Sequence, residues 1–391
     1  MSLFNRLPIQ RLAIVLMGGI FSTQLFAADI TISNGQEVIT TQASSATGDV
    51  ITIQQGGKIT TTPDNTDGVF ITNTNVSVIN SGAISTQGAG SDGIESLVTG
   101  DNASISNNDS ITTQGNSANG ILTRGDNDII NNSGSILLQG NVGSGIRSEG
   151  DITTVTNSGS ITTQGSNSEG IFSSGNNTTI SNAGSISTQG NSSEGIDSTG
   201  DNVLISNTGM IMTQGSGADG IRAIGANANI SNSGSIQVIG SGNGIDLDSG
   251  EADNSILTNA GSIIATGAGA NAIEGGTGSQ TVNLGLGSQI LGIVDLGGGT
   301  DVVNIIGVSP SANLTLVGVE TITVSQGVAA VVSGSTVTTV DPTGDAIRGT
   351  SLSTMTTGVH NAVTRRAMNT KKLKPVQLAS LELTPGMLYE E

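Results

Sequence analysis

The chain of 391 residues lacks cysteine and tryptophan and has very few aromatic side chains of any kind. It has one tyrosine and five phenylalanines, and three of these phenylalanines (Phe4, Phe21 and Phe26) lie close to the N-terminus. Beyond them, only Phe70 and Phe172 offer phenylalanine rings for packing or for stacking against a sugar. These absences exclude disulfides and a thick aromatic core. The aliphatic side chains that remain favour a thin, β-rich core over disorder.

Positive charge is also scarce in most of the chain. Residues 29–347 include 28 acidic residues and four basic ones, which are Lys58, Arg124, Arg147 and Arg222. Such a region repels nucleic acid and anionic membranes, so we expect no nucleic-acid partner. Six basic residues then fall within residues 348–374, and this shift marks a boundary. The only histidine, His360, lies beyond that boundary, which excludes a catalytic triad or a histidine metal site before it.

The N-terminal segment 1–28 has the pattern of a secretory signal peptide. Arg6 and Arg11 supply the positive charge, the segment 12–21 forms the apolar run, and Ala27 and Ala28 are small residues suited to a cleavage site. The apolar run is too short to cross about 30 Å of hydrocarbon. We therefore expect a cleaved leader and export to the periplasm, the cell surface or the medium.

An internal repeat dominates the middle of the chain. The pattern Asn-x-Gly-x-Ile recurs, with a variant at Asn107, at Asn80, Asn132, Asn157, Asn182, Asn207, Asn232 and Asn259. Between Asn132 and Asn232 the step from one asparagine to the next is constant. A Gln-Gly pair and a Gly-Ile pair keep the same step. Three short motifs that recur at the same interval predict a solenoid with one repeat per coil.

Each repeat predicts three short strands and three corners. In one of them, the β-like runs are residues 179–181, 185–188 and 195–198, separated by Gly, Asn and Ser. Strands this short pair stably only with the coils above and below them. The fold class is therefore all-β: a right-handed parallel β-helix of about 25 residues per coil and roughly a dozen coils.

Stacking turns equivalent residues into ladders about 4.8 Å apart along the rod. The isoleucine columns are expected to fill the core, and one of them comprises Ile136, Ile161, Ile186, Ile211 and Ile236. Because side chains alternate along a strand, Ile180 and Asn182 face the same way, which predicts an inward asparagine ladder. We expect Gly184 and its equivalents to take a left-handed backbone conformation.

The repeat fades after Ala272, and the pattern divides the chain into four segments. They are a signal peptide at 1–28, β-helix repeats at 29–275, terminal coils and a cap at 276–340, and a final segment at 341–391. The Val- and Thr-rich stretch 314–340 is the predicted cap. After Asp341 and Pro342, the spacing of Leu352, Met355 and Val359 predicts a helix with one apolar stripe.

This last segment resembles the linker of bacterial autotransporters just before their β-barrel. The resemblance rests on Val340-Asp341-Pro342-Thr343, on the helix with Leu352, and on residues 379–389. It implies a type V passenger that serves adhesion or self-association at the cell surface or as a secreted protein. A β-barrel translocator is expected but absent from this chain, through truncation, a separate barrel chain or another export route. We therefore expect residues 1–391 alone to reach the periplasm without anchoring in the outer membrane.

The alternative function is that of a β-helix polysaccharide lyase or hydrolase, whose sites combine carboxylates with Arg or Lys on one exposed face. The candidate carboxylates are Asp101, Asp126, Asp151 and Asp201, each following a glycine at one corner. Arg124 and Arg147 lie nearby in successive coils. Asn176 and Ala226, however, occupy the same column, so the repeat itself explains its members. We predict no catalytic residues.

No cofactor or specific metal site is expected. The sequence Gly297-Gly298-Gly299-Thr300-Asp301 comes near a calcium-binding nonapeptide, but one residue is missing and no tandem copy exists. A flat threonine lattice for ice binding is also excluded, since Leu137 and Met212 interrupt the column of Thr112. An interaction role therefore remains, with an unknown surface ligand or a second copy of the chain as partner.

Overall fold

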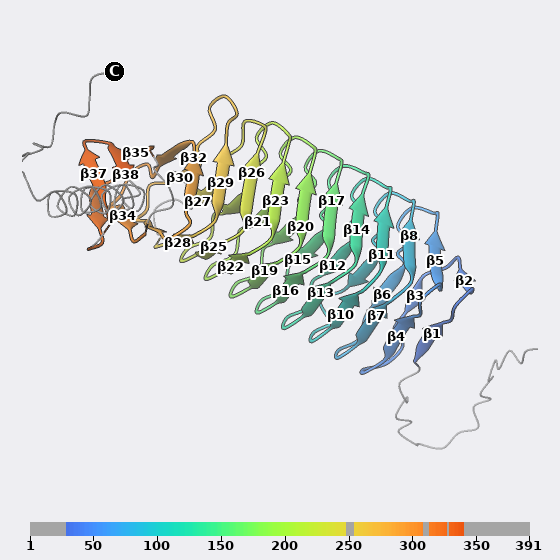
Figure 1. Ribbon diagram of the computed structural model, residues 1–391. Coiled ribbons are helices and arrows are strands. Elements are labelled where there is room, and N and C mark those ends of the chain that lie inside the picture. The colour runs from blue at the N-terminus through green and yellow to red at the C-terminus, as the bar shows by residue number, and fades with distance from the viewer. Residues whose placement is uncertain (1–28, 248–253, 308–312, 327, 340–391) are drawn as a thin grey trace, which may run out of the picture.

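A computed structural model describes residues 29–247, 254–307, 313–326 and 328–339. These residues form an all-β solenoid in which the coils stack in chain order to make a rod (Figure 1). Within them there is no helix, and so none long and apolar enough to cross a membrane. The predicted signal peptide and linker helix lie outside the described residues.

Each repeat contributes one strand to each of three sheets, because short strands alternate with tight corners, and the second of these sheets ends before the other two. The first sheet, called sheet A, is formed in order by β1 (Ile30–Ile32), β4 (Val50–Ile53), β7 (Ser77–Asn80), β10 (Ser104–Asn107), β13 (Ile129–Asn132), β16 (Thr154–Asn157), β19 (Thr179–Asn182), β22 (Leu204–Asn207), β25 (Asn229–Asn232), β28 (Ile256–Asn259), β31 (Thr281–Leu284), β34 (Val302–Ile305) and β36 (Thr321–Val324).

Sheet B follows sheet A in each coil. It is formed by β2 (Glu37–Val38), β5 (Lys58–Thr61), β8 (Ala83–Thr86), β11 (Ser110–Thr113), β14 (Ser135–Leu138), β17 (Ser160–Thr163), β20 (Ser185–Thr188), β23 (Met210–Thr213), β26 (Ser235–Val238), β29 (Ser262–Ala265) and β32 (Gln289–Leu291).

Sheet C completes each coil. It is formed by β3 (Gln42–Ala43), β6 (Val69–Ile71), β9 (Ile94–Ser96), β12 (Ile121–Thr123), β15 (Ile146–Ser148), β18 (Ile171–Ser173), β21 (Ile196–Ser198), β24 (Ile221–Ala223), β27 (Ile245–Leu247), β30 (Ile273–Gly275), β33 (Ile293–Asp295), β35 (Asn313–Val317), β38 (Thr336–Thr339) and β37 (Ala330–Ser333). The three strands predicted for one repeat correspond to β19, β20 and β21, so the coil assignment is confirmed.

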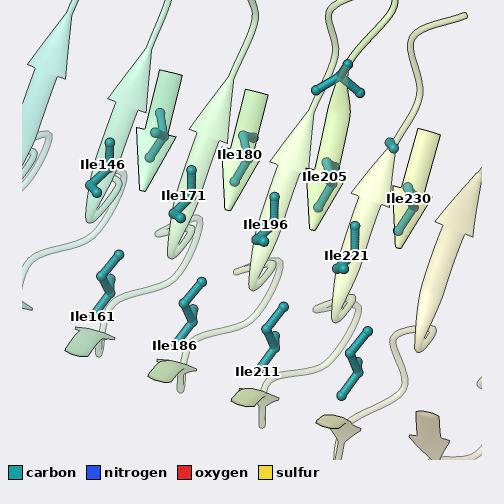
Figure 2. Close-up of a cluster of buried hydrophobic side chains, with 14 of the residues drawn as sticks. Ile146, Ile161, Ile171, Ile180, Ile186, Ile196, Ile205, Ile211, Ile221 and Ile230 are labelled. Atoms are coloured by element: carbon teal, nitrogen blue, oxygen red, sulfur yellow. The ribbon is translucent and has the colours of Figure 1, made fainter. Parts of the chain in front are cut away.

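Pairing is parallel through the repeats and in register with the sequence period. Ile136 pairs with Ile161, and the same column continues through Ile186 and Ile211 to Ile236. All five side chains are buried, which confirms the predicted stack. Figure 2 shows Ile161, Ile186 and Ile211 in one row, facing the rows of Ile146 to Ile221 and Ile180 to Ile230 from the other two sheets.

Strand direction changes near the end of the described rod. β35 and β37 both pair antiparallel with β38, unlike the parallel strands of the repeats. Leu314, Leu316 and Val337 are buried there. The aliphatic core thus continues into the residues after the last Asn-x-Gly-x-Ile motif.

The expected role of Gly184 is wrong in one respect. Left-handed backbone angles fall instead on two other corner positions, represented in this coil by Asn177 (φ 56) and Ser192 (φ 47). Asparagine tolerates this conformation better than most residues. Gly184 is required for a different reason: a Cβ there would lie 2.0 Å from the carbonyl oxygen of Gly159 in the preceding coil.

Candidate functional site

Among the described strands, charge is confined almost entirely to one of the three sheets. The strands of sheet A contain no charged residue, and those of sheet B contain only Glu37 and Lys58. Sheet C differs, because its central outward position forms a continuous column. In register, this outer column of sheet C comprises Phe70, Glu95, Leu122, Arg147, Phe172, Asp197, Arg222, Asp246, Glu274 and Asp295. Seven of these ten side chains are charged, so sheet C is the candidate interaction face.

A second polar column runs beside it, at the corner between sheets B and C. It holds the residue just before each Gly-Ile pair or its equivalent, and we call it the Gly-Ile corner column. Its members are Asp67, Asp92, Asn119, Ser144, Glu169, Glu194, Asp219, Asn243 and Asn271. Many of them cap the next coil: the backbone amide of Asp92 donates to Asp67 Oδ1 at 2.8 Å, and that of Asn119 donates to Asp92 Oδ1 at 2.6 Å. The hydrogen bonds that join successive coils at this corner therefore also fix the positions of its carboxylates.

These two columns enclose a pocket of about 510 Å³ near the N-terminal end of the rod. Its walls come from coils that are adjacent in space, and they mix acidic, amide, basic and apolar groups. The lining residues are Thr41, Asn65, Asp67, Phe70, Gly90, Asp92, Glu95, Ser117, Asn119, Leu122 and Arg124. This volume falls within the range of small-molecule sites, and the lining is more polar than is usual for them.

Three carboxylates converge in this pocket. Asp67, Asp92 and Glu95 each place one oxygen atom within 4.8 Å of the others. Hard cations such as Ca²⁺ bind oxygen ligands, so these three carboxylates are the residues that could hold a metal ion. Glu95 forms an ion pair with Arg124, which contacts Glu149 as well, with Nε 3.1 Å from a carboxylate oxygen.

Burial controls the protonation of this group. It raises the pKa of Asp92 from 3.8 to about 7, against the backbone and side-chain hydrogen bonds from Asn119, which lower it. Burial also raises the pKa of Asp67 to about 7, with further increases from the charge of Glu95 and a side-chain hydrogen bond with it. Near neutral pH the pocket therefore holds protons that a bound cation could replace.

A second acidic group lies further along the same face. Burial raises the pKa of Glu194 and of Asp219 to about 7, and nearby carboxylates add to the effect. Asp197 has a pKa raised to about 6, because burial outweighs the charge of Arg222, whose Nη1 lies 3.3 Å from Oδ2. Acidic groups with raised pKa values therefore recur along this face, whereas the pocket itself lies near the N-terminal end of the rod.

The carboxylates singled out in the sequence serve the stacking of the corner between sheets C and A. Asp101 Oδ1 accepts from the backbone amide of Asp126 at 3.1 Å, and Asp126 does the same for Asp151 at 2.9 Å. Asp201 accepts from the amide of Ala226 at 2.8 Å. Asn176 bridges the column with the same geometry, so an amide and a carboxylate are equivalent there. This is the behaviour of a structural ladder.

Arg147 belongs to β15 of sheet C and Arg124 directly follows β12 of that sheet, so neither belongs to the ladder. Both form ion pairs with Glu149, and the Cζ of Arg147 lies 4.3 Å from the ring centroid of Phe172. The second phenylalanine of the described region, Phe70, lines the pocket. Both phenylalanines therefore stand on the charged face, where they present an apolar surface beside cations and carboxylates.

The asparagine ladder runs through the interior at the corner between sheets A and B. Asn157 Nδ2 donates to Asn182 Oδ1 at 2.7 Å, and Asn182 Nδ2 donates to Asn207 Oδ1 at 2.8 Å. The same bond joins all the predicted members, together with Asn107: Asn80, Asn132, Asn157, Asn182, Asn207, Asn232 and Asn259. All are buried, and the ladder holds the coils in register.

Asp301, which follows the glycine-rich stretch, also has a structural role. Asp301 is buried, and its Oδ1 accepts from the backbone amide of Gln280 at 2.7 Å. Its own amide donates to Glu320 at 2.8 Å. His360 lies outside the described residues.

Sequence reasoning missed the pocket, although a signal for it was present. Asp67 and Asp92 both precede the Gly-hydrophobe pair that marks the start of a sheet C strand, and Glu95 follows within the next strand. Aligning the residue before each such pair would have shown the Gly-Ile corner column. No protein-family model, curated protein or solved structure matches the chain.

Proposed function

We propose that this chain is an exported, non-catalytic rod that acts through its surface in adhesion or self-association, as an autotransporter passenger does. The observation that supports this role most directly is the uninterrupted stacking. Every repeat adds the same three strands, so the rod presents long faces built from repeated columns. Solenoids of this type use extended surfaces for binding.

The distribution of charge suggests how two copies would meet. The outward side chains of sheet A are mostly Ser, Thr and Asn, as in β19 and β25, with no charged residue in the described strands. The outer column of sheet C, in contrast, repels a like surface at neutral pH. Self-association is therefore expected through sheet A, with sheet C left free for a different ligand.

Export is the first step to test. Cells expressing residues 1–391 are fractionated, and the chain is compared with a variant that lacks residues 1–28. We expect the full chain in the periplasm with its leader removed, and the truncated chain in the cytoplasm. Retention of both in the cytoplasm contradicts export.

The association step has its own measurement. Light scattering during gel filtration gives the mass of the purified chain and of Ser181→Lys and Ser206→Lys, which place cations on the outer face of sheet A. We expect association in the unaltered chain and less of it in these variants. Phe172→Lys on sheet C is the control and is expected to leave the mass unchanged. A monomer at every concentration excludes self-association and leaves adhesion as the role.

Polysaccharide cleavage is the second candidate, because the pocket brings carboxylates and Arg124 together on an exposed face. The purified chain is screened against acidic and neutral polysaccharides, together with Asp92→Asn. We expect no cleavage. Turnover that Asp92→Asn abolishes while Asp126→Asn leaves it intact would replace the rod proposal by an enzyme with its site in this pocket.

A further inference from the structure

We infer that the pocket on sheet C binds a small organic cation, specifically a primary ammonium carried on a short aliphatic stem. This ligand is independent of the proposed role of the rod. It is defined by three features of the pocket: the charge balance, the arrangement of hydrogen-bond acceptors and the apolar part of the wall.

The charge balance leaves the pocket acidic. Three carboxylates line it, from Asp67, Asp92 and Glu95, against the single guanidinium of Arg124. That guanidinium is already shared, because it forms ion pairs with both Glu95 and Glu149. One guanidinium divided between two glutamates does not balance three carboxyl groups, so the pocket attracts a cation more strongly than an anion.

The acceptors suit an ammonium group. Three oxygen atoms within 4.8 Å of one another leave a point about 2.8 Å from each, the usual length of a charged N–H···O bond. A primary ammonium has three N–H donors, one for each oxygen. Asp92 is only 4% exposed and uses Oδ1 for both hydrogen bonds from Asn119. No hydrogen bond among the described residues ends on its Oδ2.

The walls distinguish an organic cation from a metal ion. Phe70 and Leu122 lie in the outer column of sheet C on either side of Glu95, and both line the pocket. A ring face attracts an ammonium group, and apolar side chains pack against methylene groups. A volume of about 510 Å³ is also far larger than a single ion needs. The pocket therefore fits a charged head with a carbon stem.

The test is isothermal titration calorimetry of the full chain with putrescine, with Nα-acetyl-lysine amide and with calcium chloride, near pH 7. We expect one amine to bind per chain. Tighter binding of putrescine indicates free diamines as the source of the ammonium. Tighter binding of the lysine derivative indicates a lysine side chain of a partner.

Two variants decide whether the pocket is responsible. Asp92→Asn keeps an oxygen for the amides of Asn119, and Asn119 already shows that asparagine fits this column. It is expected to weaken amine binding at least tenfold. Asp219→Asn, in the same column but outside the pocket, is the matched control and is expected to bind as the unaltered chain does. Circular dichroism confirms that both variants fold.

Phe70→Leu tests how much the aliphatic stem of the ligand contributes to binding, apart from its charged group. It is expected to weaken binding of putrescine more than binding of ammonium chloride. Three results overturn the inference: no amine binding by the unaltered chain, equal weakening in Asp92→Asn and Asp219→Asn, or stoichiometric binding of calcium without binding of either amine.

Discussion

Replacing Asn132 by alanine tests whether the buried asparagine ladder stabilises the rod. The side chain makes two short bonds: Oδ1 accepts from Asn107 Nδ2 at 2.7 Å, and Nδ2 donates to Asn157 Oδ1 at 2.7 Å. The substitution deletes both and leaves a donor and an acceptor in the interior without those partners. Each such orphaned group costs about 1–3 kcal/mol, so the free energy of unfolding is expected to fall by about 2–6 kcal/mol.

The neighbouring residue provides a matched control. Asn131 belongs to the same strand, β13, but its side chain is exposed. Asn131→Ala is therefore expected to change the free energy of unfolding by no more than about 0.5 kcal/mol. Both variants are unfolded in guanidinium chloride and followed by circular dichroism. Equal midpoints for the two would refute the reasoning, because they would mean that the ladder bonds contribute no more than a surface amide.

Three further perturbations follow from the corners and the buried acids. Gly184→Ala places a Cβ 2.0 Å from a backbone oxygen and is expected to lower the midpoint of unfolding, whereas Gly298→Ala, with no atom within 4 Å, is expected to leave it unchanged. Ile152 has a φ of 58 in a column otherwise held by asparagine, so Ile152→Asn is expected to raise the free energy of unfolding by about 1 kcal/mol; a fall refutes the strain. Burial raises the pKa of Asp92 and Asp219 from 3.8 to about 7, so protonation stabilises the folded state fully below the unfolded pKa, and this contribution is lost as the pH rises through about 7. Thermal unfolding is therefore expected at a higher temperature at about pH 5 than at about pH 8, and the opposite order would show that these carboxyl groups are ionised without cost.

The architecture was accessible from sequence because one coil repeats one pattern. The constant step of the repeat places Ile161 above Ile136, and alternation then places Asn157 on the same inward side as Val155. No long-range pairing had to be guessed, since parallel stacking follows from the period. The predicted strands, the isoleucine stack and the length of the coil therefore agree with the structure.

The pocket was harder to predict because its acidic residues belong to two columns. Asp67 and Asp92 occupy the Gly-Ile corner column and Glu95 the outer column of sheet C, so no single motif contains all three. Arg124 lies one coil beyond Glu95, and only the folded register brings the two together. The role of Gly184 could not be predicted either, because the short distance between its backbone and that of the preceding coil depends on the folded structure and not on the local sequence.

The asparagine ladder has one further property, which is direction. Every link donates toward the later coil, from Asn80 Nδ2 through to Asn259 Nδ2, which donates to Ser288 Oγ at 2.7 Å. The amide dipoles therefore add along the rod instead of cancelling, and each bond polarises the next. One end of the ladder, at Asn80 Oδ1, carries partial negative charge, and the other carries partial positive charge. The interior of the rod is consequently polar along its axis between Asn80 and Ser288, although the ladder itself contains no charged side chain.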